Sequence, residues 1–175
     1  MTIKADLATA LPEITLLCAA CFILVVDLFL PLSRRHISYW LTQAALALTA
    51  WIVLTNVRAD PVQGFNGMVI DDNMGDLLEL TAIGVVSLMM FYGRRYFTVR
   101  GIFTGETFVL VLFALLGMIV MISAGSFLTL YLGLELQALA LYALVALHRD
   151  RRGPAEAAMK YFVLGALASG MLLYG

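Results

Sequence analysis

Residues 127–147 read FLTLYLGLELQALALYALVAL, an apolar run whose single charged residue is Glu135. A run of this length spans the hydrocarbon core of a bilayer as a helix, which takes roughly 17–25 residues. A carboxylate near the centre of such a helix costs roughly 2.5–3.5 kcal/mol on insertion scales. It is usually retained because it has a partner, a water-filled cavity or a proton to carry. Glu135 is therefore the first candidate functional residue.

The composition of the whole chain supports a membrane setting. Hydrophobic residues make up 62% of the chain and charged residues 13%, against about a quarter charged in typical soluble domains. The mean hydropathy is +0.95. These values predict an integral membrane protein that contacts the lipid bilayer. The formal net charge of −1 offers no basic patch, so we expect no nucleic-acid partner.

The chain contains five complete apolar runs and the beginning of a sixth. They cover residues 11–32, 39–57, 77–92, 108–123 and 127–147, and the last begins near residue 155. The runs are continuous rather than alternating, which argues against barrel strands. We predict an all-α fold, a polytopic transmembrane helical bundle of about six helices. Because the last run is still apolar at Gly175, we also expect the sequence to be the N-terminal part of a longer chain.

Basic residues predict the orientation of these helices. Three alternate loops hold eight arginines, namely Arg34, Arg35, Arg94, Arg95, Arg100, Arg149, Arg151 and Arg152. The opposite side has only Lys4 and Arg58, beside an acidic loop. Lysine and arginine mark the cytoplasmic side of membrane proteins. The N-terminus is therefore predicted to be periplasmic, and the arginine clusters are interpreted as topogenic signals.

Cys18 and Cys21 form a C-x-x-C pair inside the first apolar run. This spacing occurs in redox and metal sites, but here it lies in an apolar helix without a second cysteine pair or a nearby histidine. Free cysteine behaves as a small hydrophobic residue. We therefore interpret both cysteines as packing residues.

Three acids lie near the ends of predicted helices. Asp27 comes one turn before the end of the first helix, where we expect it to pair with Arg34 or Arg35. Glu13 and Glu79 lie near the outer ends of their helices, where we expect their side chains to reach headgroups or water.

Lys160 is the second candidate site residue. It lies about 8 Å into the sixth helix, whereas Glu135 lies about 12 Å into the fifth. Their depths differ by roughly 10 Å, so a water or a third residue could bridge them across the antiparallel pair; the alternative is that Lys160 snorkels to the interface. A cation 6 Å from a carboxylate contributes about 2.8 kcal/mol at an effective dielectric near 20, and about 1.4 kcal/mol at 12 Å. A glutamate–lysine pair with a variable gap would therefore serve as a proton relay. Nearby polar side chains that could hold water are Ser123, Ser126, Thr129, Tyr131, Gln137 and Tyr142.

Two stretches carry a resemblance to a known family. SFLTLYLGLELQ at 126–137 resembles the helix that bears the intramembrane glutamate of antiporter-like membrane subunits, and EAAMKYF at 156–162 resembles the start of the next helix. The opening LPEIT at 11–15, together with Asp27, is most similar to the subunit N family of the proton-pumping NADH–quinone oxidoreductase, respiratory complex I.

The resemblance implies a role for each candidate residue and a division of the chain. Glu135 matches the intramembrane glutamate of the family, and Lys160 matches a lysine at the start of its next helix. The main lysine partner in the family lies on a later helix, beyond Gly175. The chain would be a single membrane domain, 1–175, with three flanking helices in 1–100 and the start of a proton-translocating inverted-repeat unit in 101–175.

The resemblance also implies a function, partners and a location. The chain would contribute to proton translocation coupled to electron transfer from NADH to quinone, beside the other membrane subunits of complex I, in the bacterial inner membrane. It would bind no cofactor itself, since NADH, FMN, iron–sulfur clusters and quinone are expected on other subunits. The alternatives are a component of a multisubunit Na⁺/H⁺ antiporter and a passive helical scaffold in which Glu135 only binds a neighbouring helix.

Overall fold

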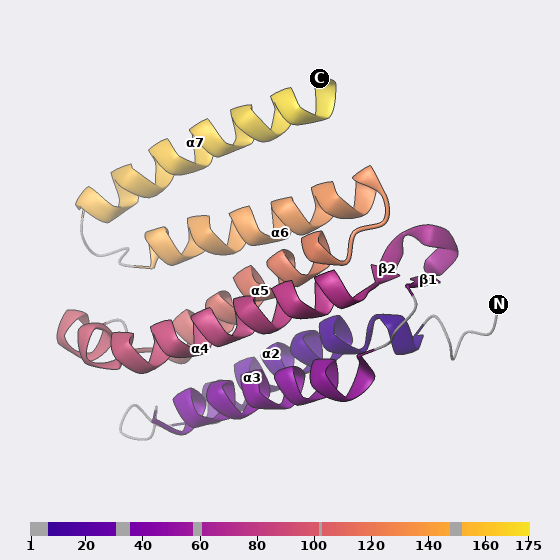
Figure 1. The fold of residues 1–175 in the computed structure, drawn as a ribbon. Helices are drawn as coiled ribbons and strands as arrows, with labels where there is room; N and C mark the ends of the chain where they lie inside the picture. Colours follow the sequence, from indigo (N-terminus) through magenta and orange to yellow (C-terminus); the bar gives the residue numbers. More distant parts are fainter. Residues whose placement is uncertain (1–6, 31–35, 58–60, 102, 148–151) are drawn as a thin grey trace.

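The computed structural model describes residues 7–30, 36–57, 61–101, 103–147 and 152–175, with side chains from 155 onward in the last range. These residues form six long helices and one β-hairpin (Figure 1). The helices are α2 (Leu11–Phe29), α3 (His36–Asn56), α4 (Asn73–Arg100), α5 (Gly105–Ile122), α6 (Phe127–Ala146) and α7 (Arg152–Tyr174). Each is long and apolar enough to cross a membrane. The predicted all-α polytopic bundle is confirmed.

Helix α4 is longer than its apolar run. It covers 28 residues, Asn73–Arg100, whereas the apolar run predicts 77–92, or 77–97 at its longest. The Asp72 side chain begins the helix by accepting a hydrogen bond from the Gly75 backbone N–H at 2.7 Å, as an N-cap does. Gly101 ends it in the left-handed region at φ +73°, the usual C-terminal signal. The polar ends of this helix therefore extend past the segment that hydropathy marks.

Helix α5 is the centre of the bundle. It packs against α2, α3, α4 and α6, and its Leu112, Leu115 and Ile119 are completely buried. A helix that is apolar on every face needs neighbours on every face when it lies inside a bundle. Helices α2, α3, α4 and α6 are therefore placed by how they meet α5, whereas α7 packs on α6.

Two glycines bring α5 and α6 into backbone contact. A Cβ added to Gly117 would lie 2.6 Å from the Gln137 backbone nitrogen and 2.7 Å from the Gly133 carbonyl oxygen. A Cβ on Gly133 would lie 2.9 Å from the Gly117 carbonyl oxygen. Small residues allow membrane helices this close approach. The short connection at 123–126 joins the two helices as antiparallel neighbours.

The loop between α3 and α4 folds into a β-hairpin, although the sequence marks it only as an acidic loop between two apolar runs. Its antiparallel strands are β1 (Val62–Gly64) and β2 (Val69–Asp71), joined by the short 3₁₀ turn η2 (Phe65–Gly67). The hairpin is anchored on the α5–α6 connection. The Ile70 N–H donates to the Ser123 carbonyl at 2.8 Å, and the Gly125 N–H donates to the Met68 carbonyl at 2.9 Å. It therefore covers one end of the bundle.

Helix α7 packs on α6 at the edge of the bundle (Figure 1). Gly165 and Ser169, one turn apart, make the contact: Gly165 lies against the Tyr142 hydroxyl of α6, and Ser169 bonds to α6 side chains. Gly170 has no described atom within 4 Å of its ideal Cβ position. One face of α7 is thus packed, and the other is open.

Candidate functional site

The register of α6 directs Glu135 toward α7. Gly133 touches α5, and Glu135, two residues later, lies about 200° further round the helix. Tyr131 comes one turn before Glu135 and Tyr142 two turns after it, so all three side chains share one face. The glycine contact with α5 therefore fixes the acid on the opposite side, near the middle of the helix.

Glu135 belongs to a chain of hydrogen bonds between α6 and α7. The Ser169 hydroxyl donates to the Glu135 carboxylate oxygen Oε1. The oxygens of Ser169 and Tyr131 are 3.0 Å apart and share a second hydrogen bond. Because serine has a single O–H donor, Tyr131 must be the donor of that second bond. The chain thus runs from Tyr131 through Ser169 to Glu135, and Ser169 is buried at 9% exposure.

An aromatic cluster holds the two helices together on the loop side of Glu135. The Tyr142 ring packs edge-on against Tyr161 at 4.9 Å and against Phe162 at 5.6 Å, measured between ring centroids. Such pairs add about 0.5–1.5 kcal/mol beyond the area they bury. Tyr142 also interacts electrostatically with Glu135. The α6–α7 interface therefore combines the hydrogen bonds around Glu135 with an aromatic cluster that packs the two helices together.

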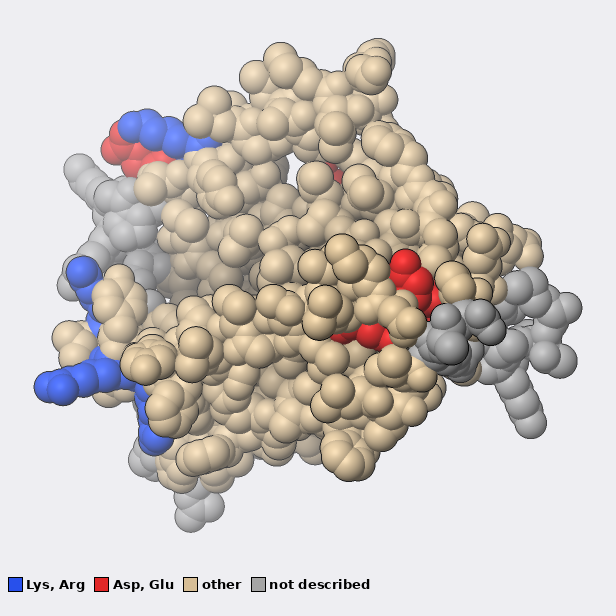
Figure 2. All heavy atoms as spheres, in the orientation of Figure 1, with Lys and Arg blue, Asp and Glu red and all other residues tan. Residues whose placement is uncertain are grey.

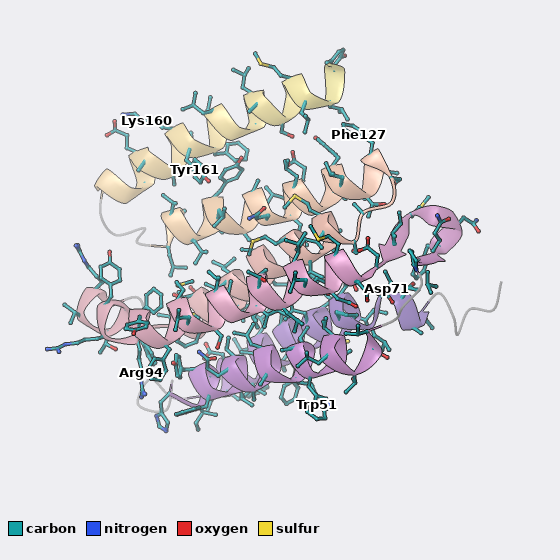
Figure 3. The ribbon with its side chains drawn as sticks, viewed as in Figure 1. Trp51, Asp71, Arg94, Phe127, Lys160 and Tyr161 are labelled. Carbon is teal, nitrogen blue, oxygen red and sulfur yellow. The ribbon has the colours of Figure 1, made fainter. Side chains whose placement is uncertain are left out.

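The structure does not bring Lys160 to Glu135. The Lys160 ammonium lies 2.6 Å from the Glu156 carboxylate, one helical turn earlier, and the two side chains are 71% and 68% exposed. Nine residues separate Lys160 from Ser169, which places it about 13.5 Å along α7 and on the opposite face. Figure 3 shows Lys160 directed away from α6. Its role as a relay residue stays a prediction.

Of the three acids near helix ends, Glu79 differs from expectation. The Asp27 carboxylate accepts a hydrogen bond from the Ser38 hydroxyl at 2.6 Å and lies against Gly105, the first residue of α5. Its predicted partners, the arginines at 34 and 35, are outside the described residues. Glu79 does not reach the headgroups, because it is only 6% exposed. Glu13 is half-buried and accepts a hydrogen bond from the Ser123 hydroxyl at 2.7 Å, so its contact with headgroups or water stays a prediction.

Charge separates toward the two ends of the molecule. Figure 2 shows Lys and Arg side chains gathered at one end, whereas Asp and Glu dominate the other end of the face in view. Helix α4 illustrates the pattern, since Asp76 lies in its first turn and Arg100 in its last. This distribution agrees with the bias from which the orientation is predicted. The periplasmic N-terminus itself stays a prediction.

The cysteines do not pack inside the bundle. Both Cys18 and Cys21 are free and exposed on α2, so the interpretation as interior packing residues is wrong. Among the residues that the structure describes, no group of three or more His, Cys, Asp or Glu side chains is arranged to hold a metal ion.

A family profile matches the part of the chain that contains Glu135. It is described as NADH:quinone oxidoreductase/Mrp antiporter, transmembrane, and it covers residues 124–175. Curated relatives extend the similarity to almost the whole sequence. NADH-quinone oxidoreductase subunit N of Methylovorus glucosotrophus is 52% identical over 99% of this chain, and that of Thiobacillus denitrificans is 52% identical over 96%. The chain spans about a third of the length of these relatives, 36% and 35% respectively.

Solved structures agree on the fold. A chain of respiratory complex I from Thermus thermophilus, solved with bound aureothin, is 28% identical, with a TM-score of 0.76 over 93% of this chain and 35% of its own. A chain of the membrane-bound sulfane sulfur reductase, an archaeal respiratory membrane complex, gives a TM-score of 0.73 at 28% identity, over 99% of this chain and 36% of its own. With these matches, the chain is similar to the antiporter-like membrane subunits of NADH-quinone oxidoreductases, and it resembles subunit N along nearly its whole length.

Proposed function

We propose that the full-length protein translocates protons as a membrane subunit of NADH–quinone oxidoreductase, with Glu135 as the switching carboxylate. The observation that carries this proposal is the position of Glu135 near mid-helix, in a hydrogen-bond chain with Ser169 and Tyr131. A carboxylate at this depth raises the free energy of membrane insertion, so it is not expected in a helix whose only role is to span the membrane. Similarity to the subunit N relatives supports the coupling to electron transfer from NADH to quinone.

The hydroxyl chain gives Glu135 a means to exchange a proton. Ser169 donates to the carboxylate, and Tyr131 replaces the donated hydrogen by donating to Ser169. Moving each hydrogen along its bond would protonate Glu135 and leave Tyr131 as a phenolate. A proton delivered through water would then restore the Tyr131 hydroxyl. No backbone movement is needed for this transfer. Both states of the acid keep a hydrogen-bond partner, which suits a group that changes charge.

Lys160 is proposed as an auxiliary residue of the relay. It lies on the face of α7 that is directed away from α6 (Figure 3). Its ammonium is exposed and paired with Glu156, and its distance from Glu135 exceeds the roughly 8–10 Å beyond which exposed charges are screened. Lys160 would therefore act on Glu135 through a bridging water or a movement of α7 rather than by direct electrostatic attraction.

The remaining parts of the proposal follow the same similarity. Residues 1–100 would form the flanking helices, and residues 101–175 the start of the proton-translocating unit. The other membrane subunits of complex I would be the partners, in the bacterial inner membrane with the N-terminus periplasmic. NADH, FMN, iron–sulfur clusters and quinone would be bound by other subunits.

The test is proton pumping by the assembled complex that carries Glu135→Gln in the full-length subunit. We expect lower pumping per NADH oxidised with normal assembly, and a milder loss for Glu135→Asp, which keeps the charge. Glu106→Gln is the matched control, because Glu106 is exposed in the first turn of α5. Unchanged pumping in a normally assembled Glu135→Gln complex would contradict the proposal and leave Glu135 as a structural contact.

A multisubunit cation antiporter is the second candidate, because the family profile names Mrp antiporters beside the oxidoreductases. This candidate uses the same helices and the same glutamate. It predicts Na⁺/H⁺ exchange that persists without NADH, and a protein that does not copurify with iron–sulfur subunits. NADH-dependent pumping that is indifferent to Na⁺ would exclude it.

A further inference from the structure

A small cavity lies where the β-hairpin meets the bundle, far along the helices from the α6–α7 loop. Its volume is about 10 Å³, which is about the space that one water molecule needs. Most of its lining is polar or acidic: Thr9, Ile70, Asp71, Asp72, Gly75, Asp76, Glu79 and Ser123. The hairpin covers this end of the bundle through Ile70, whose N–H donates to the Ser123 carbonyl at 2.8 Å.

Glu79 lines this cavity with an unsatisfied oxygen. Its side chain is 6% exposed, and its carboxylate oxygen Oε2 is buried without a hydrogen-bond partner among the described residues. A buried polar atom without a partner costs about 1–3 kcal/mol, and more for a charged group. The site therefore lacks a donor at Glu79.

Glu13, on α2, carries a second unsatisfied oxygen; it does not line the cavity but bonds to Ser123, which does, and it interacts electrostatically with Glu79. Its Oε1 accepts a hydrogen bond from the Ser123 hydroxyl at 2.7 Å, whereas its Oε2 is buried without a described partner. Ser123 also lines the cavity. Because its single hydroxyl hydrogen is given to Glu13, the Ser123 hydroxyl can only accept a further bond from the cavity side. The unsatisfied oxygens therefore require a hydrogen-bond donor in or beside the cavity.

The surrounding charges are also negative. Glu79 interacts electrostatically with Glu13, Asp76 and Asp71, and Glu13 interacts with Asp71. Asp72 is the N-cap of α4. Neither glutamate forms an ion pair with a Lys or Arg that the structure describes. Burying two carboxylates near other acids is costly unless a positive charge joins them.

We propose that Glu13 and Glu79 hold one proton between them, bridged by a water molecule in this cavity. A proton with its water fits the volume and supplies the missing donors. The described acids do not form a three-ligand group suited to a metal ion, so a proton fits better than a cation. The site lies on α2, α4 and the α5–α6 connection, apart from Glu135, and it does not depend on the function proposed above.

The test measures reversible unfolding of the full chain against pH in lipid nanodiscs. The proposal gives the folded state one more bound proton than the unfolded state. The wild-type unfolding equilibrium constant should therefore rise about tenfold per pH unit over the range in which the folded state holds this proton and the unfolded state has lost it, and it should level off once the folded state is also deprotonated. Glu79→Gln and Glu13→Gln should each flatten this dependence, since an amide matches a protonated carboxyl in shape and cannot become charged. The double variant should flatten the pH dependence no further than either single variant does, because the two acids share a single proton. Glu106→Gln should keep the wild-type dependence.

A second measurement does not depend on these variants folding. In a Glu135→Gln background at neutral pH, the infrared spectrum should contain a protonated-carboxyl C=O band that shifts on ¹³C labelling of glutamate and disappears at alkaline pH. Absence of the band, or a wild-type pH dependence retained in both single variants, would overturn the proposal. Stability that follows Na⁺ instead of pH, with choline as the control ion, would overturn it in favour of a bound cation.

Discussion

Removing the Ser169 hydroxyl tests the contact on which the Glu135 site is built. Ser169→Ala deletes the donor to Glu135 and the acceptor for Tyr131 together. A hydrogen bond to a charged group contributes about 1.5–3 kcal/mol in soluble proteins, whereas interhelical bonds in membranes average about 0.6 and reach about 1.7 kcal/mol. Because this chain joins three groups and ends on an acid, we expect a Ser169–Glu135 coupling of about 1.5 kcal/mol, near the upper limit.

The assay is a double-mutant cycle on the full chain in bicelles, with Ser169→Ala, Glu135→Gln and the double variant compared by unfolding free energy. Gly170→Ala is the control, because its added methyl group meets no described atom within 4 Å and should cost nothing. A coupling below about 0.3 kcal/mol is within the error of additivity for independent sites. That result would refute the hydrogen-bond chain. The same Ser169→Ala variant should also pump fewer protons in the assembled complex.

Three further predictions concern packing, charge and helix ends. Gly133→Ala should lower stability by about 1–3 kcal/mol through overpacking against the α5 backbone. Gly84→Ala, which meets no described atom within 4 Å, should be neutral or gain up to about 1 kcal/mol of helix propensity. Equal unfolding midpoints for the two variants would contradict the close contact of Gly133 with α5. Lys160→Gln should change stability by less than about 0.5 kcal/mol, because exposed ion pairs contribute little, yet it should reduce pumping by the complex; normal pumping would remove Lys160 from the relay. Asp72→Ala should cost about 0.5–2 kcal/mol of stability by removing the α4 cap, and a thermal midpoint equal to wild type would show that the cap is dispensable.

The number and order of the helices follow from the sequence because the membrane-spanning segments are continuous apolar runs. The ends are less predictable, since α4 extends over polar residues that hydropathy excludes but that Asp72 and Gly101 delimit. The hairpin at 62–71 is missed because its strands have three residues each. Such short strands have no periodicity to read, and this hairpin is stabilised by bonds to Ser123 and Gly125 far along the chain.

The candidate site is predictable in its acid but not in its partners. Glu135 is conspicuous because no other residue in its run is charged at neutral pH. Nothing in the sequence singles out Ser169, although serines at a helix contact can donate hydrogen bonds across it. Lys160 attracts attention as the charge that lies deepest in the next helix, but its register relative to Ser169 puts it on the opposite face. Comparing the helical angles of Lys160, Gly165 and Ser169 shows that only one face of α7 can pack on α6.

Redox-triggered infrared difference spectroscopy of the assembled complex tests the central claim most directly. Quinone reduction by NADH should produce a change in a carboxyl C=O band, because Glu135 gains or loses its proton during turnover. The band should be absent in Glu135→Gln and retained in Glu106→Gln. Identical difference spectra for wild type and Glu135→Gln would contradict the account, because the acid between α6 and α7 would then keep one protonation state throughout the cycle.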